Sequence, residues 1–149
     1  MASRRINDVN RTTIARASAA ACIAVAGFVH FRIWQNEYRH APVREMFFAN
    51  AVVSALLAVG LVAGIAFGRP RSPTQRRLFL AGLVFSLASL AAFALSRGPG
   101  LPTLHGSFKE HGLETTAAYL FGIGSAKVAL VAETATAVLC GWLLVARPR

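Results

Sequence analysis

Four long apolar stretches constrain the fold of this chain more than any other feature of its sequence. A helix needs about 20 mostly apolar residues to cross the hydrocarbon core of a membrane, and each stretch is long enough to do so. The 149 residues are 55% hydrophobic and 15% charged, which is too apolar for an ordinary soluble domain of this size. The sequence therefore predicts an all-α, four-helix transmembrane bundle that forms a single domain, with spans at about 14–34, 46–67, 78–96 and 124–146.

The first apolar stretch also has features of a cleavable signal peptide. Basic residues precede it, and Ala24-Val25-Ala26 resembles a cleavage site. The apolar run nevertheless continues through residues 27–29, beyond that site. We therefore expect this segment to remain in the protein as the first membrane span.

Basic residues are distributed unevenly among the segments that flank the spans. Ten arginines lie in the amino-terminal segment, the second loop and the carboxyl-terminal tail, whereas the first and third loops with their flanks hold five basic residues. The positive-inside rule therefore predicts a plasma-membrane protein with both termini in the cytoplasm. The ten are Arg4, Arg5, Arg11, Arg16, Arg69, Arg71, Arg76, Arg77, Arg147 and Arg149, and the five are Arg32, Arg39, Arg44, Arg97 and Lys109.

The net charge of +10 would suggest a nucleic-acid partner in a soluble protein. Here the basic residues fall between apolar runs and do not form one patch with interleaved aromatic residues, so we expect no nucleic-acid binding. The expected partners are the lipid bilayer and either another membrane protein or further copies of this chain.

Glu133 is the one acidic residue inside a predicted span. A charged side chain at the centre of a membrane helix costs roughly 2.5–3.5 kcal/mol on insertion scales, so it usually faces protein. At helical spacing, the face around Glu133 carries mostly small or polar residues, which favour packing against other helices. We therefore predict that Glu133 points into the bundle. The predicted inner face is Ala126, Ala129, Leu130, Glu133, Thr136, Ala137 and Cys140, and the outer face is Val128, Val131, Val138, Trp142 and Val145.

The other three spans have comparable packing faces, and His30 and Asn50 lie on them at a depth similar to that of Glu133. One interpretation is an outward-facing polar pocket in which Glu133 is a base or cation ligand that exchanges protons near neutral pH, with His30 and Asn50 as its partners. The other is a protonated Glu133 that only holds helices together by hydrogen bonds. The faces are Ala19, Ile23, Ala26, Gly27 and His30; Asn50, Ser54, Leu57, Gly60 and Gly64; and Gly82, Ser86, Ser89 and Ser96.

Local motifs predict how some helices pack and begin. Gly60 and Gly64 have the spacing that lets helix backbones approach closely, and we expect them to pack within the bundle. Residues 72–75 predict a helix start, with Ser72 as the N-cap and Gln75 completing a capping box. Residues 107–110 form a similar pattern, which indicates a short surface helix in the third loop.

The sequence assigns no catalytic residue, metal site or cofactor. Cys22 and Cys140 lie inside spans without the spacing of a disulfide framework or zinc site. The loops carry histidines and carboxylates, but no pair has the H-x-x-x-H spacing of helical metal ligands, so we interpret them as ordinary polar loop residues. Haem ligation by two histidines would require a second histidine within a span. The loop residues are Glu37, His40, His105, Glu110 and His111.

Several short segments, spread over nearly the whole chain, are similar to those of a known group of proteins. They are His30-Phe31-Arg32-Ile33-Trp34, Glu37-Tyr38 with Pro42, Phe48-Ala49-Asn50, Leu95-Ser96 followed by Gly100-Leu101, and the acid in the last span. Together they resemble small four-span bacterial integral membrane proteins of unknown function. The resemblance implies the same four-helix architecture and suggests that His30, Asn50 and Glu133 occupy recurring positions, but it implies no activity. The chain differs from that group at residues 105–116, where its third loop is longer and more charged.

Three classes of function are compatible with these observations. The first is a non-enzymatic accessory or interaction subunit, which the short loops and the lack of a catalytic constellation favour. The second is a small proton- or cation-coupled transporter or channel that uses Glu133, although no inverted repeat or broken helix pair is visible. The third, a metal- or redox-handling membrane enzyme that uses the histidines, has the least support.

Overall fold

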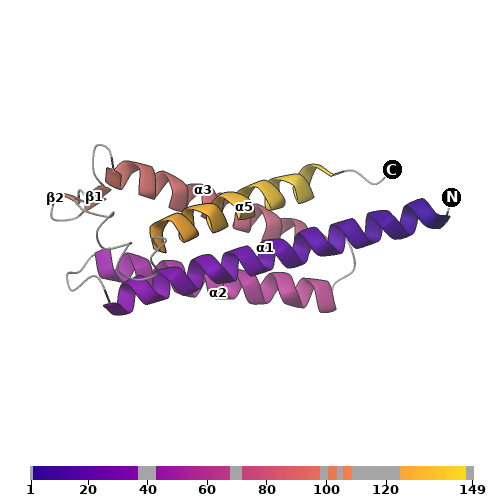
Figure 1. The fold of residues 1–149 in the computed structure, drawn as a ribbon, viewed down its shortest axis with the longest axis horizontal. Coiled ribbons are helices and arrows are strands. Elements are labelled where there is room, and N and C mark those ends of the chain that lie inside the picture. Colours follow the sequence, from indigo (N-terminus) through magenta and orange to yellow (C-terminus); the bar gives the residue numbers. More distant parts are fainter. Residues whose placement is uncertain are drawn as a thin grey trace.

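A computed structural model describes residues 2–36, 43–67, 72–97, 101–103, 106–108 and 125–146 of the chain. The described residues form four long helices, α1 (Ala2–Asn36), α2 (Val43–Ala66), α3 (Pro73–Arg97) and α5 (Ser125–Val145), and two short strands, β1 (Leu101–Thr103) and β2 (Gly106–Phe108) (Figure 1). The strands pair antiparallel, with Leu101 opposite Phe108. Ser107 and Phe108 therefore lie in a strand, and the prediction that a short helix begins there was wrong.

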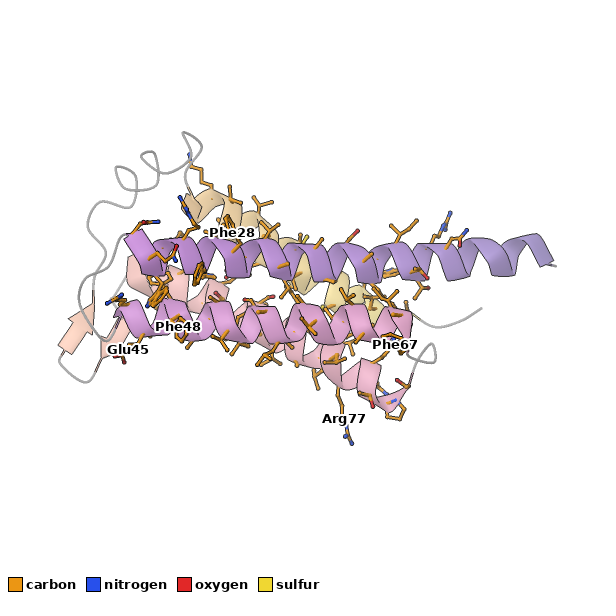
Figure 2. The ribbon with its side chains drawn as sticks, turned by 90° about the horizontal axis from the view of Figure 1, so that it is seen from below. Phe28, Glu45, Phe48, Phe67 and Arg77 are labelled. Atoms are coloured by element: carbon orange, nitrogen blue, oxygen red, sulfur yellow. The ribbon has the colours of Figure 1, made fainter. Side chains whose placement is uncertain are left out.

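Each of the four helices contains a stretch that is long and apolar enough to cross a membrane: Asn10–Asn36, Arg44–Ala66, Pro73–Leu95 and Lys127–Val145. Large apolar side chains cover the outside of the helices, as Figure 2 shows for Phe28 and Phe67, the latter 91% exposed. Such an exterior suits lipid and would be unfavourable in water. The chain thus has the makeup of a multi-pass helical membrane protein, as the sequence predicted.

The four helices run lengthwise beside one another (Figure 1). The start of α1 and the end of α5 lie at one end of the bundle, called here the terminus end, and β1 and β2 lie at the other, the hairpin end. Helix α1 packs extensively against α2 and α5, and α3 packs extensively against α5. The contact between α2 and α3 is smaller. The order around the bundle is therefore α2, α1, α5, α3.

Small residues set how closely the helices approach. A Cβ atom at Gly60 would lie 3.1 Å from a methyl group of Leu78, and one at Gly64 would lie 3.1 Å from the amide nitrogen of Gln75. Both glycines of α2 therefore face α3 of the same chain. On α3, Gly82 lies against Cys140 of α5 in the same manner, with 3.1 Å to its sulfur.

The start of α3 shows both a correct and a wrong prediction. The backbone N–H of Gln75 donates to the hydroxyl oxygen of Ser72 at 3.3 Å, so Ser72 is the N-cap, as predicted. The side chain of Gln75 does not complete a capping box. It is buried, and its amide nitrogen donates to the backbone carbonyl of Gly64 near the end of α2. A link between two helices therefore takes the place of the expected local cap.

The inner and outer faces of α5 are largely as predicted. Glu133, Thr136 and Cys140 are buried, whereas Val131 and Val138 are more than half exposed. Two residues differ from the prediction, because Leu130 is 36% exposed and Val128 packs against buried residues of α1.

Candidate functional site

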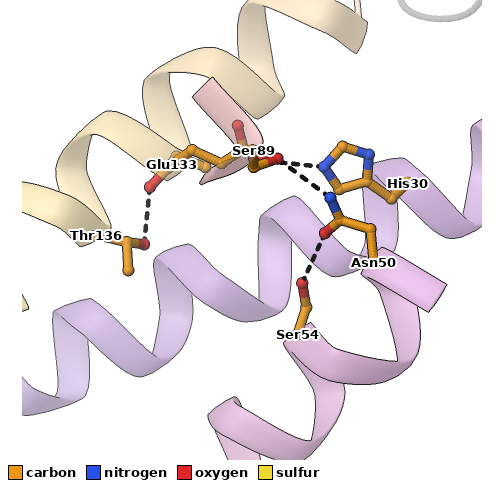
Figure 3. Close-up of polar contacts among 7 residues, drawn as sticks. His30, Asn50, Ser54, Ser89, Glu133 and Thr136 are labelled. Carbon is orange, nitrogen blue, oxygen red and sulfur yellow. Dashed lines mark hydrogen bonds and ion pairs between the residues drawn. The ribbon is translucent and has the colours of Figure 1, made fainter. Parts of the chain in front are cut away.

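Polar side chains from all four helices meet in one layer of the bundle (Figure 3). The polar layer consists of His30 from α1, Asn50 and Ser54 from α2, Ser89 from α3 and Glu133 from α5. It lies on the packing faces that the sequence predicted, so each residue is aimed inward by its position on its own helix. The sequence did not show whether these residues meet. The order of the helices around the bundle brings them together.

The contact between His30 and Glu133 joins residues 103 positions apart in the chain. Nε2 of His30 lies 2.8 Å from Oε1 of Glu133. Both residues are buried, with 7% and 4% of their surfaces exposed. An ionised carboxylate so placed needs hydrogen-bond donors, because burying a charge without partners is strongly unfavourable. His30 supplies one donor when Nε2 carries a proton.

Ser89 supplies a second donor to the same carboxylate oxygen. Its hydroxyl lies 2.5 Å from Oε1 of Glu133 and accepts a hydrogen bond of 3.1 Å from the amide nitrogen of Asn50. The amide oxygen of Asn50 in turn accepts from the hydroxyl of Ser54 at 3.4 Å. Each hydrogen bond in the series from Ser54 through Asn50 and Ser89 is therefore donated in the direction of Glu133. This is the pattern expected around a negative charge.

Three buried hydroxyls lie toward the terminus end, one helical turn from Asn50, Ser89 and Glu133. Ser54, Ser86 and Thr136 are almost completely buried. Thr136 satisfies its own hydroxyl by donating to the backbone carbonyl of Ala132 at 2.8 Å. The hydroxyl of Thr136 is therefore used within α5, while Ser54 extends the network around Glu133.

Apolar clusters cover the polar layer on both sides. The hairpin-end cluster is small and consists of buried Val29, Ile33 and Ala129 with Phe47 and Val128 packed against them. The ring of Phe47 lies on the imidazole of His30, with 5.6 Å between the ring centroids. The terminus-end cluster is larger, and its buried members are Ala19, Ala20, Ile23, Ala58, Leu61, Phe79 and Cys140.

A second polar feature, which the sequence analysis missed, lies nearer the terminus end. Arg16 was assigned only to the flanking positive charge, yet it is 6% exposed and its guanidinium lies 5.8 Å from the ring centroid of Phe79. The signal that could have found it is its position on the same helix face as Ala19, Ile23 and His30.

The structure brings His30 and Glu133 into direct contact and connects Asn50 to them through Ser89. Ser89 was predicted only as a packing residue. Within the described residues, no group of three or more His, Cys, Asp or Glu side chains is placed to hold a metal ion. The loop residues weighed as metal ligands, Glu37, His40, His105, Glu110 and His111, lie outside the described residues.

Comparisons with models of protein families, with curated proteins and with solved structures found no significant match to this chain. The resemblance to small four-span bacterial membrane proteins therefore stays a prediction. We therefore infer the function of this protein from the chemistry of the polar layer and from the surface of the bundle.

Proposed function

We propose that this chain is a non-enzymatic accessory or interaction subunit of the plasma membrane, with both termini in the cytoplasm. Its partners are the lipid bilayer and either another membrane protein or further copies of the chain. The observation that supports this most is that Glu133 is hydrogen-bonded to side chains of both α1 and α3. The acid is thereby engaged in holding three helices together.

The energetic effect of such a layer is moderate but specific. Interhelical hydrogen bonds in membrane proteins contribute about 0.6 kcal/mol each on average and up to about 1.7 kcal/mol. A helix rotated or shifted along its axis would leave the buried carboxylate without donors, which is far more costly. The layer thus fixes the relative positions of the helices, and with them the apolar outer faces of α2 and α3 that a partner in the membrane would contact.

The test is purification of the tagged full-length chain from its native membranes in a mild detergent. The proposal expects a constant molar ratio to one membrane protein, or a defined homo-oligomer, measured by native mass spectrometry. Glu133→Gln should weaken the assembly by destabilising the chain, whereas Glu45→Gln at the exposed start of α2 should leave it intact. A chain that is purified as a monomer from native membranes under every mild condition would contradict the proposal.

A second candidate, a small proton- or cation-coupled transporter or channel, is favoured by one observation. His30 and Glu133 form a buried pair of titratable side chains, and buried ionisable residues in membrane spans commonly mark proton or ion pathways. Proton-coupled uptake into proteoliposomes that is lost in Glu133→Gln but retained in Glu45→Gln would support it. Four helices rarely enclose a pathway alone, so this function would also require an oligomer.

A further inference from the structure

One ring nitrogen of His30 is buried and has no hydrogen-bond partner among the described residues. Nε2 is engaged with Glu133, whereas Nδ1 meets no partner in the part of the chain that the structure describes. The side chain of His30 is only 9% exposed. Nearly all buried polar atoms in folded proteins are hydrogen-bonded, so an unpartnered one marks a position where a water, an ion or a proton is expected. In histidine, a bare ring nitrogen is itself a proton acceptor.

The charge on the pair identifies the ligand. Ser89 donates to Oε1 of Glu133, and Nε2 of His30 lies 2.8 Å from the same oxygen, so both groups can donate to an ionised carboxylate. With the carboxyl ionised and the imidazole protonated only at Nε2, the pair carries one negative charge in a layer covered by apolar clusters on both sides. A net buried charge is unfavourable there, and one added proton removes it.

We propose that the His30–Glu133 pair reversibly binds one proton, which enters and leaves at Nδ1 of His30. A proton from a hydronium ion, which leaves as water, forms the Nδ1–H bond and converts His30 to an imidazolium beside the carboxylate. Transfer of the Nε2 proton to Oε1 of Glu133 then gives a neutral imidazole and a neutral acid. The imidazolium–carboxylate form and the neutral form hold the same number of protons. Binding of the added proton changes the net charge of the pair from minus one to zero.

Within the described residues, the groups that contact the pair or its network from the other helices are uncharged. They are Phe47 and Asn50 of α2 and Ser89 of α3. On the same helices, the nearest charged residues in sequence are Arg32 and Lys127. Arg32 follows His30 by two positions and Lys127 precedes Glu133 by six, so they lie about 160° and about 120° around their helices. A proton bound in this layer is therefore held chiefly by the pair itself.

We expect the proton to reach Nδ1 from the hairpin end. Phe47 covers the imidazole there as part of a cluster with three buried members. Toward the terminus end, the layer is followed by buried hydroxyls and then by the larger cluster around Ile23, Phe79 and Cys140. Among the described residues, the apolar cluster on the hairpin side of His30 has fewer buried members than the one on the terminus side, and Phe47 packs against the smaller one.

The test uses the full chain in lipid nanodiscs with nitrogen-15 histidine, in a variant in which His40, His105 and His111 are replaced by Gln so that only His30 reports. Between about pH 5 and pH 8, the range in which histidine titrates, we expect one reversible shift of the Nδ1 signal. The infrared band of the carboxyl group should change at the same pH. Glu133→Gln should abolish the carboxyl change, and Glu45→Gln should leave it in place.

Two outcomes would overturn the inference. The first is an Nδ1 signal that stays constant from about pH 5 to pH 8. This measurement leaves His30 and Glu133 unaltered, so it does not depend on whether variants at these positions fold. The second is a change in the carboxyl band that persists in Glu133→Gln.

The side from which the proton enters is tested by two substitutions in α2. Phe47→Ala should broaden the Nδ1 signal by faster exchange with water, and Phe48→Ala, at the neighbouring exposed position, should not. Equal behaviour of the two variants would contradict entry past Phe47. The inference rests on the pair alone and holds for either function proposed above.

Discussion

Gly27 of α1 lies so close to Ser54 of α2 that a Cβ atom at Gly27 would stand 2.6 Å from the Cβ of Ser54. Gly27 is one helical turn from His30, and Ser54 is one turn from Asn50. This close approach of two backbones therefore holds the α1 and α2 parts of the polar layer at the same level. Packing by small residues and hydrogen bonding in the layer depend on each other.

Gly27→Ala should destabilise the bundle, because the added methyl group overlaps Ser54 and must push α1 and α2 apart. Overpacking of this kind typically costs about 1–3 kcal/mol. Gly141→Ala is the matched control, since a Cβ there would meet nothing within 4 Å, and its effect should stay within about 0.5 kcal/mol. The measurement is the free energy of unfolding in bicelles by steric trapping. Equal effects of the two substitutions would show that α1 and α2 are not in this contact.

Gln75→Ala should weaken the link between α2 and α3 near the terminus end. The substitution removes the hydrogen bond from the side-chain amide to the carbonyl of Gly64, which is worth about 0.6–1.7 kcal/mol between membrane helices. Gln35→Ala, at an exposed position near the end of α1, serves as the control and should be neutral. A Gln75→Ala variant as stable as the unsubstituted chain would contradict the link between Gln75 and the carbonyl of Gly64.

The two cysteines should differ in reactivity because they differ in burial. Cys140 is fully enclosed and lies against Gly82, whereas Cys22 is half-buried. Thiol labelling with a small maleimide in mild detergent should modify Cys22 first, and Cys140 only when the bundle unfolds in sodium dodecyl sulfate. Single Cys22→Ser and Cys140→Ser variants assign each labelling phase. Rapid labelling of Cys140 in the folded chain would contradict the packing of α5 against α3.

Both ends of the chain are predicted to lie in the cytoplasm. The positive-inside rule gives this orientation, and the four spans return α5 to the end of the bundle where α1 begins. Reporter enzymes fused to the carboxyl terminus should be active only if they function in the cytoplasm, while reporters inserted in the first loop should show the opposite pattern. Activity of an extracytoplasmic reporter at the carboxyl terminus would reverse the assignment.

Periodicity predicted much of this fold because membrane helices satisfy their own backbone and differ mainly in which face is small or large. It identified the four helices and aimed Glu133, Thr136 and Cys140 inward. It was wrong for Leu130 and Val128, because the hairpin-end part of α5 leans on Val29 and Ile33 of α1, which rotates the buried face away from Leu130. A regular spacing of 100° per residue cannot include such local contacts.

The polar layer was predictable in its members but not in its connections. His30, Asn50 and Glu133 stood out as polar residues at one depth, whereas Ser89 resembled any other small packing residue. The role of Ser89 depends on α3 lying beside α5, and helix order is not encoded in the periodicity of a single helix. Gln75 shows the same principle, since a local capping pattern gave way to a hydrogen bond with α2 that only the assembled bundle offers.

The contact between His30 and Glu133 joins α1 to α5 within the polar layer, and its energy can be measured by a double-mutant cycle. His30→Phe keeps the ring against Phe47 and Glu133→Met keeps the volume, so each removes the contact with little repacking. In bicelles, the free energies of unfolding should show a coupling of about 0.5–2 kcal/mol between the two sites. Effects that add within about 0.3–0.5 kcal/mol would show that the two side chains do not interact.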